Sequence, residues 1–233
     1  MSGAMATLPG VDALLASGVI AVVRAREAVS LSAAARALAA AARALAAGGV
    51  GGVEITLTTP GAIEAIRALA SDAGLAGCLI GAGTVLDEAA ARDVIAAGAR
   101  FVVSPTLDPA VIRACRDRDI PCMPGAFTPT EILAAWRAGA SLVKLFPAAA
   151  VGPGYARDIL APMPFLRVVP SGGVSLENAG EWIRAGAAAV SVGGALLSAA
   201  LLRSESGAEL TRGARALVER VAEARRVVGG DPA

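Results

Sequence analysis

Lys144 is the residue of this sequence best suited to chemistry, because it is the single lysine of a 233-residue chain whose other 20 basic residues are arginines. An arginine stays protonated in proteins, whereas a lysine amine can lose its proton and attack a carbonyl carbon. Lys144 interrupts the apolar run at residues 142–146, and apolar surroundings lower the pKa of a lysine by disfavouring its charged form. The pattern predicts a Schiff-base nucleophile. The alternative is a structural lysine that pairs with Glu54 or extends toward solvent from a strand end.

Two other charged residues lie in apolar segments. Glu54 is an acid among β-branched residues, and a carboxyl in such a place can move protons while a carbinolamine dehydrates and an enamine is protonated. Arg24 ends an apolar segment, and a fixed guanidinium there can hold a carboxylate through two hydrogen bonds. The alternatives are a structural carboxylate paired with an arginine for Glu54 and an exposed loop arginine for Arg24.

The composition excludes several other reaction classes. The chain has no histidine, which removes histidine-based nucleophilic triads, histidine general bases and histidine-ligated metals. Its three cysteines lack ligand spacing, and Gly81-Ala82-Gly83 is followed by Leu86 where a dinucleotide-binding loop needs a third glycine. We therefore expect neither a metal nor a cofactor.

Charge and hydropathy also restrict the partners. The formal net charge is +1, and only four Phe, two Trp and one Tyr could stack on bases, so we expect no nucleic-acid partner. The charge-free run at residues 185–202 is broken by Ser191 and Gly193 and has no basic flank, so we expect no membrane association. An odd number of unpaired cysteines and a start without a signal-peptide pattern predict a cytoplasmic protein.

Eight short apolar segments, each followed by a segment with helical periodicity, are the elements that must position these residues. The predicted strands are residues 19–24, 53–56, 79–81, 101–104, 122–125, 142–146, 167–170 and 189–192. An extra helix is predicted at residues 11–16. Parallel strands without a polar face favour a closed (β/α)8 TIM barrel of the α/β class, and an open doubly wound sheet is the alternative. We expect residues 1–10 to be disordered, residues 11–228 to form this single domain and residues 229–233 to fray.

In such a barrel the reacting groups lie where strands end in loops. Because side chains alternate along a strand, Arg24, Glu54 and Lys144 can point into one cavity. Two glycine-rich segments follow the last two strands, where barrel enzymes bind phosphate through backbone N–H groups. They are Ser171-Gly172-Gly173 and Gly193-Gly194. The alternative for both is that they are ordinary turns.

Seven motifs in this order resemble the 2-keto-3-deoxy-6-phosphogluconate (KDPG) aldolase family, which includes 4-hydroxy-2-oxoglutarate aldolases; the likeness runs over residues 19–228. The motifs are Ala21-Val22-Val23-Arg24, Val53-Glu54-Ile55-Thr56-Leu57, Gly81-Ala82-Gly83-Thr84-Val85, Val103-Ser104-Pro105, Met123-Pro124-Gly125, Val143-Lys144-Leu145-Phe146-Pro147 and Pro170-Ser171-Gly172-Gly173-Val174.

The resemblance implies a metal-independent class I aldolase, acting as a homotrimer on a keto-acid phosphate. Lys144 would be the Schiff-base lysine and Glu54 the acid/base. Arg24 and Thr84 would hold the carboxylate side of pyruvate, Pro105 and Phe146 would wall the cavity, and the glycine pairs with Ser171 would take the phosphate.

Three positions depart from the family pattern. Many members have arginine at Thr58, threonine at Ser171 and serine at Ala195. The first change shifts carboxylate binding toward Arg24, and the last removes a donor beside the phosphate. Alternatives to KDPG cleavage are an aldolase for the C4-epimeric 6-phosphogalactonate substrate, a non-catalytic phosphate-binding barrel, and a barrel isomerase or synthase with the same phosphate site.

Overall fold

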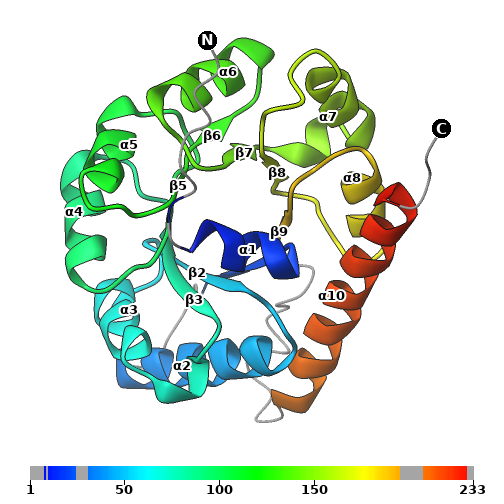
Figure 1. Ribbon diagram of the computed structural model, residues 1–233. Helices are drawn as coiled ribbons and strands as arrows, with labels where there is room; N and C mark the ends of the chain where they lie inside the picture. The colour runs from blue at the N-terminus through cyan, green and yellow to red at the C-terminus, as the bar shows by residue number, and fades with distance from the viewer. Residues whose placement is uncertain (1–7, 9, 25–30, 195–206, 230–233) are drawn as a thin grey trace.

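The computed structural model describes residues 8, 10–24, 31–194 and 207–229, and it has parallel strands surrounded by helices (Figure 1). The strands are β1 (Val19–Val23), β2 (Gly52–Thr56), β3 (Leu79–Gly83), β4 (Val102–Val103), β5 (Cys122–Met123), β6 (Gly125–Ala126), β7 (Val143–Leu145), β8 (Val168–Pro170) and β9 (Val190–Val192). The helices are α1 (Val11–Ser17), α2 (Leu31–Ala47), α3 (Ala62–Ala70), α4 (Glu88–Ala96), α5 (Pro109–Arg116), α6 (Pro129–Ala138), α7 (Pro153–Leu160), α8 (Ala179–Arg184) and α10 (Gly207–Gly229), with short 3-10 turns η1 (Ala73–Leu75) and η2 (Ala148–Ala150). The predicted α/β class is confirmed.

The hydrogen bonds define two parallel sheets rather than the single closed eight-stranded sheet predicted from the sequence. One sheet has the order β5-β4-β3-β2-β1-β9 and the other the order β6-β7-β8. The strand expected at residues 122–125 is divided at Pro124, which has no N–H to donate to a ladder. At the other junction the described link between β8 and β9 is an isolated bridge from Ser171 to Ser191.

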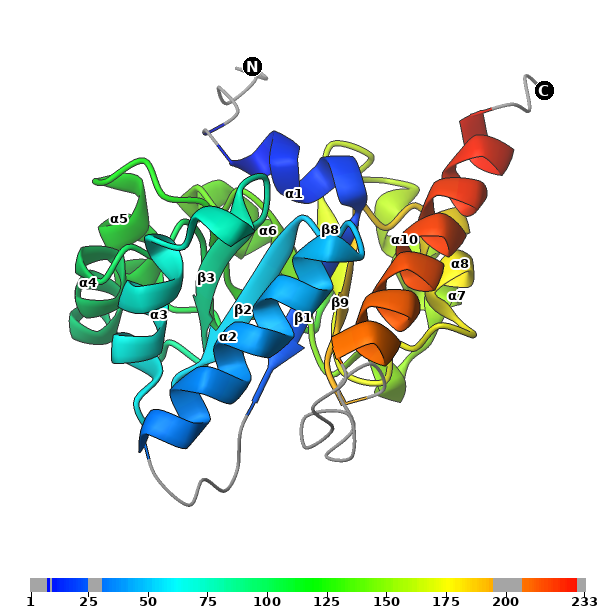
Figure 2. The ribbon, with the colours of Figure 1, turned by 90° about the horizontal axis from the view of Figure 1, so that it is seen from below.

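Helix α1 lies across one end of the strands, where the sequence predicted an extra helix (Figure 2). Gly10 and Gly18 bound it in the left-handed conformation, with φ of 95° and 67°. Leu14 projects from α1 into an apolar cluster that includes Ile20 and Phe101. This cluster fills the interior at the amino ends of the strands, so a site inside the ring can open only at their carboxyl ends.

Three of the outer helices begin where a polar side chain accepts a hydrogen bond from a free backbone N–H group. Asp87 caps α4, Asp108 caps α5, and Thr128 with Glu131 forms a capping box at α6. Helix α10 packs between α2 and α8, and the hydroxyl of its Thr211 donates to the carbonyl of Ala44 at 2.9 Å. Among the described helices, none is long and apolar enough to cross a membrane.

Candidate active site

Lys144 lies at the centre of β7 with its side chain 7% exposed. Its neighbours Val143 and Leu145 pack in the core cluster under the helices, whereas Leu142 belongs to the interior cluster with Leu14. Lys144 therefore shares the inward face of the strand with Leu142, as strand alternation requires. Its amine Nζ lies 4.8 Å from the centroid of the Phe146 ring, so one face of this cation is covered by an aromatic side chain.

Glu54 lies on β2 and is 1% exposed. Burial raises the pKa of this carboxyl above its usual value of 4.5, while the charges of Lys144 and then Arg24 oppose the shift. Within the described part of the chain its Oε2 atom has no hydrogen-bond partner. A buried carboxyl with a raised pKa can act as a general acid and base. Lys144 and Arg24 lie close enough to Glu54 for their charges to act on it.

Gly83 makes the space for that carboxyl. A Cβ atom built on Gly83 would overlap Glu54 Oε1 and lie 2.6 Å from Glu54 Cγ. Gly83 is paired with Thr56 in the β2–β3 ladder, two residues beyond Glu54. Gly83 belongs to the glycine segment that lacks the third glycine of a dinucleotide-binding loop. Because Gly83 has no side chain, it leaves the space that the Glu54 carboxyl occupies.

The remaining predicted pyruvate-site residues follow the carboxyl ends of their strands. Arg24 comes directly after β1 and is exposed. Thr84 comes directly after β3 and has φ of 59°, the left-handed conformation that a residue with a side chain rarely adopts. Pro105 follows β4, and its carbonyl leaves no room for a Cβ at Gly125, the residue opposite Lys144 in the β6–β7 ladder.

The two predicted phosphate segments lie at the ends of the adjacent strands β8 and β9. Gly172 and Gly173 have φ of 82° and 87°, and a Cβ on Gly172 would lie 3.2 Å from the Phe146 ring. The carbonyls of Ser171 and Gly172 accept from the N–H groups of Ala148 and Ala149, both at 2.8 Å.

Gly193, after β9, packs beside Val22, while Gly194 is exposed, and no described residue lies within 4 Å of a Cβ built on it. Ala195, the third departure from the family pattern, lies outside the described residues.

The buried hydroxyls of Ser191 and Thr56 were not among the predicted site residues. Ser191 on β9 is 1% exposed and accepts from the Ser171 hydroxyl at 3.4 Å. Thr56 is fully buried, and its hydroxyl lies 3.1 Å from that of Thr58. Strand alternation could have found both, because Ser191 and Thr56 occupy inward-facing positions two residues from Ala189 and Glu54.

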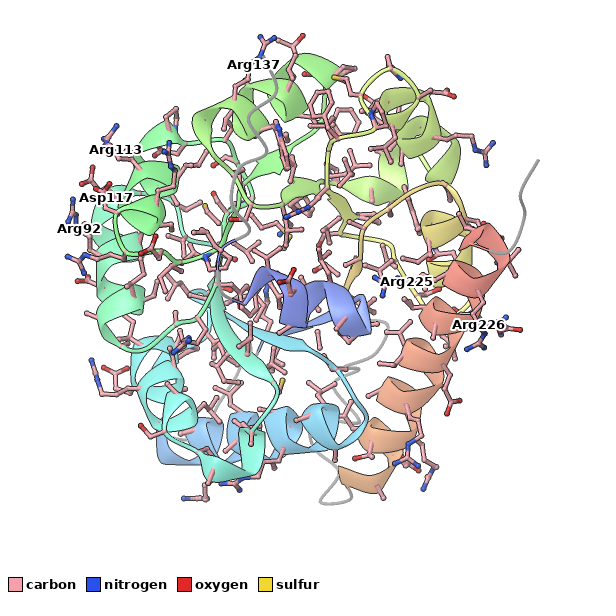
Figure 3. The ribbon with its side chains drawn as sticks, in the orientation of Figure 1. Arg92, Arg113, Asp117, Arg137, Arg225 and Arg226 are labelled. Carbon is pink, nitrogen blue, oxygen red and sulfur yellow. The ribbon has the colours of Figure 1, made fainter. Side chains whose placement is uncertain are left out.

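Unlike the buried Lys144, two of the described arginines lie on the outside of the fold. Arg92 and Arg113 project from the outer rim of the molecule, with side chains 49% and 62% exposed, and both bind Glu88 (Figure 3). Within the described residues no group of three or more acidic or cysteine side chains is arranged to hold a metal ion.

A parallel α/β fold with a buried lysine on β7 and a buried carboxyl on β2 has the two groups that Schiff-base chemistry needs. The chain belongs to the KDPG and KHG aldolase family, a family of lyases, whose model matches residues 11–212.

Similar proteins with known names are also aldolases. A 2-dehydro-3-deoxy-phosphogluconate aldolase of Pseudomonas aeruginosa is 39% identical over 182 residues, which are 77% of this chain and 81% of the relative. A probable 2-dehydro-3-deoxy-6-phosphogalactonate aldolase of Rhizobium meliloti is 42% identical over 145 residues, which are 62% of this chain and 68% of the relative.

A solved relative has a similar fold. The KDPG aldolase of Legionella pneumophila, crystallised with pyruvate captured as a covalent carbinolamine, superposes with a TM-score of 0.78 at 30% identity, covering 89% of this chain and 97% of that one. The resemblance inferred from the seven motifs is thereby confirmed.

Proposed function

We propose that this protein is a class I aldolase that cleaves 2-dehydro-3-deoxy-6-phosphogluconate to pyruvate and D-glyceraldehyde 3-phosphate through a Schiff base on Lys144. The observation that carries the proposal is the position of the single lysine of the chain, buried on β7 where its charge influences the buried carboxyl of Glu54. Membership in the KDPG and KHG aldolase family supports it.

The bonds change in a balanced sequence. The neutral amine of Lys144 adds to the C2 ketone, and the carbinolamine loses water to form a Schiff base. Transfer of the C4 hydroxyl proton to the Glu54 carboxylate then breaks the C3–C4 bond, which releases the aldehyde and leaves an enamine. Protonation of C3 and addition of water release pyruvate and regenerate the amine.

Glu54 supplies the protons in this scheme. Its raised pKa allows the carboxyl to give a proton to the departing carbinolamine hydroxyl and to return one to C3 of the enamine. Arg24 and Thr84 hold the carboxylate of the substrate, while Pro105 and Phe146 enclose its reacting carbons. Thr58 contributes a hydroxyl instead of a guanidinium at the mouth of the site, so Arg24 carries most of the charge recognition.

The phosphate of the substrate binds at the carboxyl ends of β8 and β9. Ser171 and the glycine pairs Gly172-Gly173 and Gly193-Gly194 let the backbone approach an anion closely. The 4-hydroxy-2-oxoglutarate substrate, which would give pyruvate and glyoxylate, needs no phosphate site and is a second expected substrate. The C4-epimeric 6-phosphogalactonate is a further candidate because the Rhizobium meliloti relative carries that name.

Borohydride trapping tests the proposal directly. Reduction in the presence of pyruvate should attach one three-carbon unit to Lys144, and Lys144→Arg should prevent both trapping and turnover while the circular dichroism spectrum stays unchanged. The α-amino group is the other primary amine of the chain, so Lys144→Arg also measures background labelling. A peptide map with Lys144 unmodified would refute the assignment.

A lactate dehydrogenase-coupled assay separates the substrates. KDPG, its C4 epimer and 4-hydroxy-2-oxoglutarate should be compared at equal concentration, and we expect KDPG to release pyruvate fastest. Binding of a sugar phosphate without any pyruvate release would instead identify a non-catalytic phosphate-binding protein.

We also infer that the two sheets are arcs of one closed TIM barrel. The N–H of Lys144 donates to the carbonyl of Pro124 at 2.9 Å, which joins β7 to the segment between β5 and β6, and the N–H of Ala188 donates to the carbonyl of Val168 at 2.9 Å beside the Ser171–Ser191 bridge. These bonds continue the ladder across both junctions. Slow hydrogen exchange at Lys144 and Ala188 would support closure, and exchange at the rate of exposed loops would contradict it.

A cytoplasmic homotrimer is the assembly we expect. Phe165 is 52% exposed beside Trp136, with ring centroids 6.2 Å apart, and an exposed aromatic of this size is common at subunit contacts. The described cysteines are all free and buried, which suits a reducing compartment. Light scattering coupled to size exclusion should give three times the mass of one chain.

A further inference from the structure

The position of Lys144 depends on the segment that follows β5. The N–H of Lys144 donates to the carbonyl of Pro124 at 2.9 Å, and the N–H of Phe146 donates to the carbonyl of Ala126 at 3.1 Å. Lys144 faces Gly125 in this ladder. Any movement of residues 124–126 would therefore carry the backbone of Lys144 with it.

The residues after β6 are fixed from two sides. The N–H groups of Phe127 and Thr128 donate to Oε2 of Glu131 at 3.0 and 2.8 Å. The carbonyl of Phe127 accepts from the hydroxyl of Tyr155 at 2.8 Å, and the two rings stack with centroids 5.9 Å apart and an interplanar angle of 25°. The Phe127 peptide is thus restrained at its N–H, its carbonyl and its side chain.

Tyr155 reaches this peptide from the part of the chain that follows Lys144. It is the one tyrosine of the chain and belongs to α7, which follows β7 and η2. Between Phe146 and Tyr155, the N–H groups of Ala148 and Ala149 donate to the carbonyls of Ser171 and Gly172, directly after β8. The chain leaving β7 is therefore attached at η2 to the segment after β8 and at Tyr155 to the segment after β6.

We propose that Tyr155 is a positioning residue for Lys144. Its hydroxyl and ring join the loop after β6 to the helix after β7, and so keep the two strands in the register that holds the amine beside Phe146 and near Glu54. The proposal rests on the proposed aldolase function. Small displacements of a nucleophile reduce rates strongly, because about 1 Å of misplacement can cost about 100-fold, whereas one hydroxyl–carbonyl bond contributes little to global stability.

Tyr155→Phe removes the hydroxyl and keeps the stacked ring, and Tyr155→Leu removes both. The matched control is Thr211→Val, which deletes a hydroxyl–carbonyl bond of nearly the same length between α10 and α2, on the outer helices. Each protein is mixed with pyruvate and quenched with borohydride over time. The end point counts competent lysines, and the rate reports how fast Lys144 forms the Schiff base.

For Tyr155→Phe we expect the trapping rate and kcat, per competent lysine, to fall about 5-fold with KM changed less than about 2-fold, because loosening by a fraction of 1 Å costs part of the 100-fold effect. Tyr155→Leu should fall further, and Thr211→Val should match the wild type. A purely structural role would lower the number of competent lysines and the melting temperature while the rate per lysine stayed constant, and that result would overturn the proposal.

The proposed function and this inference fail in different ways. If wild-type protein is not trapped by pyruvate at all, the aldolase function is wrong and the positioning role falls with it. If wild-type protein is trapped and turns over, but Tyr155→Phe behaves like Thr211→Val, only the positioning role is wrong.

Discussion

Replacing Gly83 by alanine should displace the side chain of Glu54 while leaving its carboxyl group intact. The new methyl group would overlap Oε1 of Glu54 and lie 2.6 Å from its Cγ. The clashing atoms are the far end of a flexible side chain, whereas the backbones of Gly83 and Glu54 are held in the β2–β3 ladder. We therefore expect the carboxyl to shift away from the reacting carbons rather than the strand to move.

The magnitude follows from two costs. Inserting a methyl group into a packed interior destabilises a protein by about 1–3 kcal/mol. A carboxyl displaced by about 1 Å loses about 100-fold in rate, within the range of about 100- to 10,000-fold that general acid–base groups supply. Gly83→Ala should therefore fold with a lowered melting temperature and lose about 100-fold in kcat.

Gly81→Ala is the matched control on the same strand. The three atoms nearest to a Cβ there, at 2.5–2.6 Å, all belong to the Phe101 ring in the interior cluster, so Gly81→Ala crowds the core where Gly83→Ala crowds Glu54. Pyruvate release by both variants should be measured alongside thermal unfolding. Full activity in Gly83→Ala, or an equal loss in Gly81→Ala once corrected for folded fraction, would refute the assigned use of Gly83.

Two further predictions concern Glu54 and the cap of α6. Because burial raises the pKa of Glu54 in the folded state, the native protein holds a proton that the unfolded chain has released, and stability falls as pH rises above 4.5. Glu54→Gln should thus raise the melting temperature at pH 7–8, the gain should vanish below about pH 4.5, and turnover should drop; a constant gain at every pH would contradict this. Thr128→Ala removes the hydroxyl that accepts from the Glu131 N–H at 3.3 Å and should cost about 1 kcal/mol in urea denaturation, whereas the neighbouring Thr130→Ala should be neutral.

Much of the fold was predictable because the strands are short runs of buried apolar residues. The predicted strand at residues 19–24 corresponds to β1 at Val19–Val23, and the helix expected at residues 11–16 corresponds to α1. The division of the strand at Pro124 could also have been predicted, because proline has no backbone N–H group to donate in a ladder. What the pattern could not predict is how the hydrogen bonds join strands that are distant in sequence: the described ladders form two sheets and not the one continuous sheet expected.

The same limit applies to the candidate active site: alternation along one strand could be predicted, whereas contacts between distant elements could not. Inward-facing positions on β2 and β7 follow from alternation, so the meeting of Glu54 with Lys144 could be anticipated. The use of Gly83 and the bond from Tyr155 to Phe127 could not, because each depends on a contact between two elements whose spacing the sequence does not encode locally. The positive φ of Thr84 could not be predicted either, because nothing in the neighbouring residues indicates it.

The choice of lysine over arginine at position 144 then has a physical reason beyond composition. A guanidinium beside Glu54 would keep the carboxylate ionised and could not itself become a nucleophile. Deprotonation of a lysine to the neutral amine that attacks removes a positive charge from beside Glu54, and loss of that charge raises the pKa of a carboxyl that burial already raises. Generation of the nucleophile would thereby favour the protonated acid needed to expel water from the carbinolamine. A chain without histidine can run this sequence because the nucleophile sets the protonation state of its own proton donor.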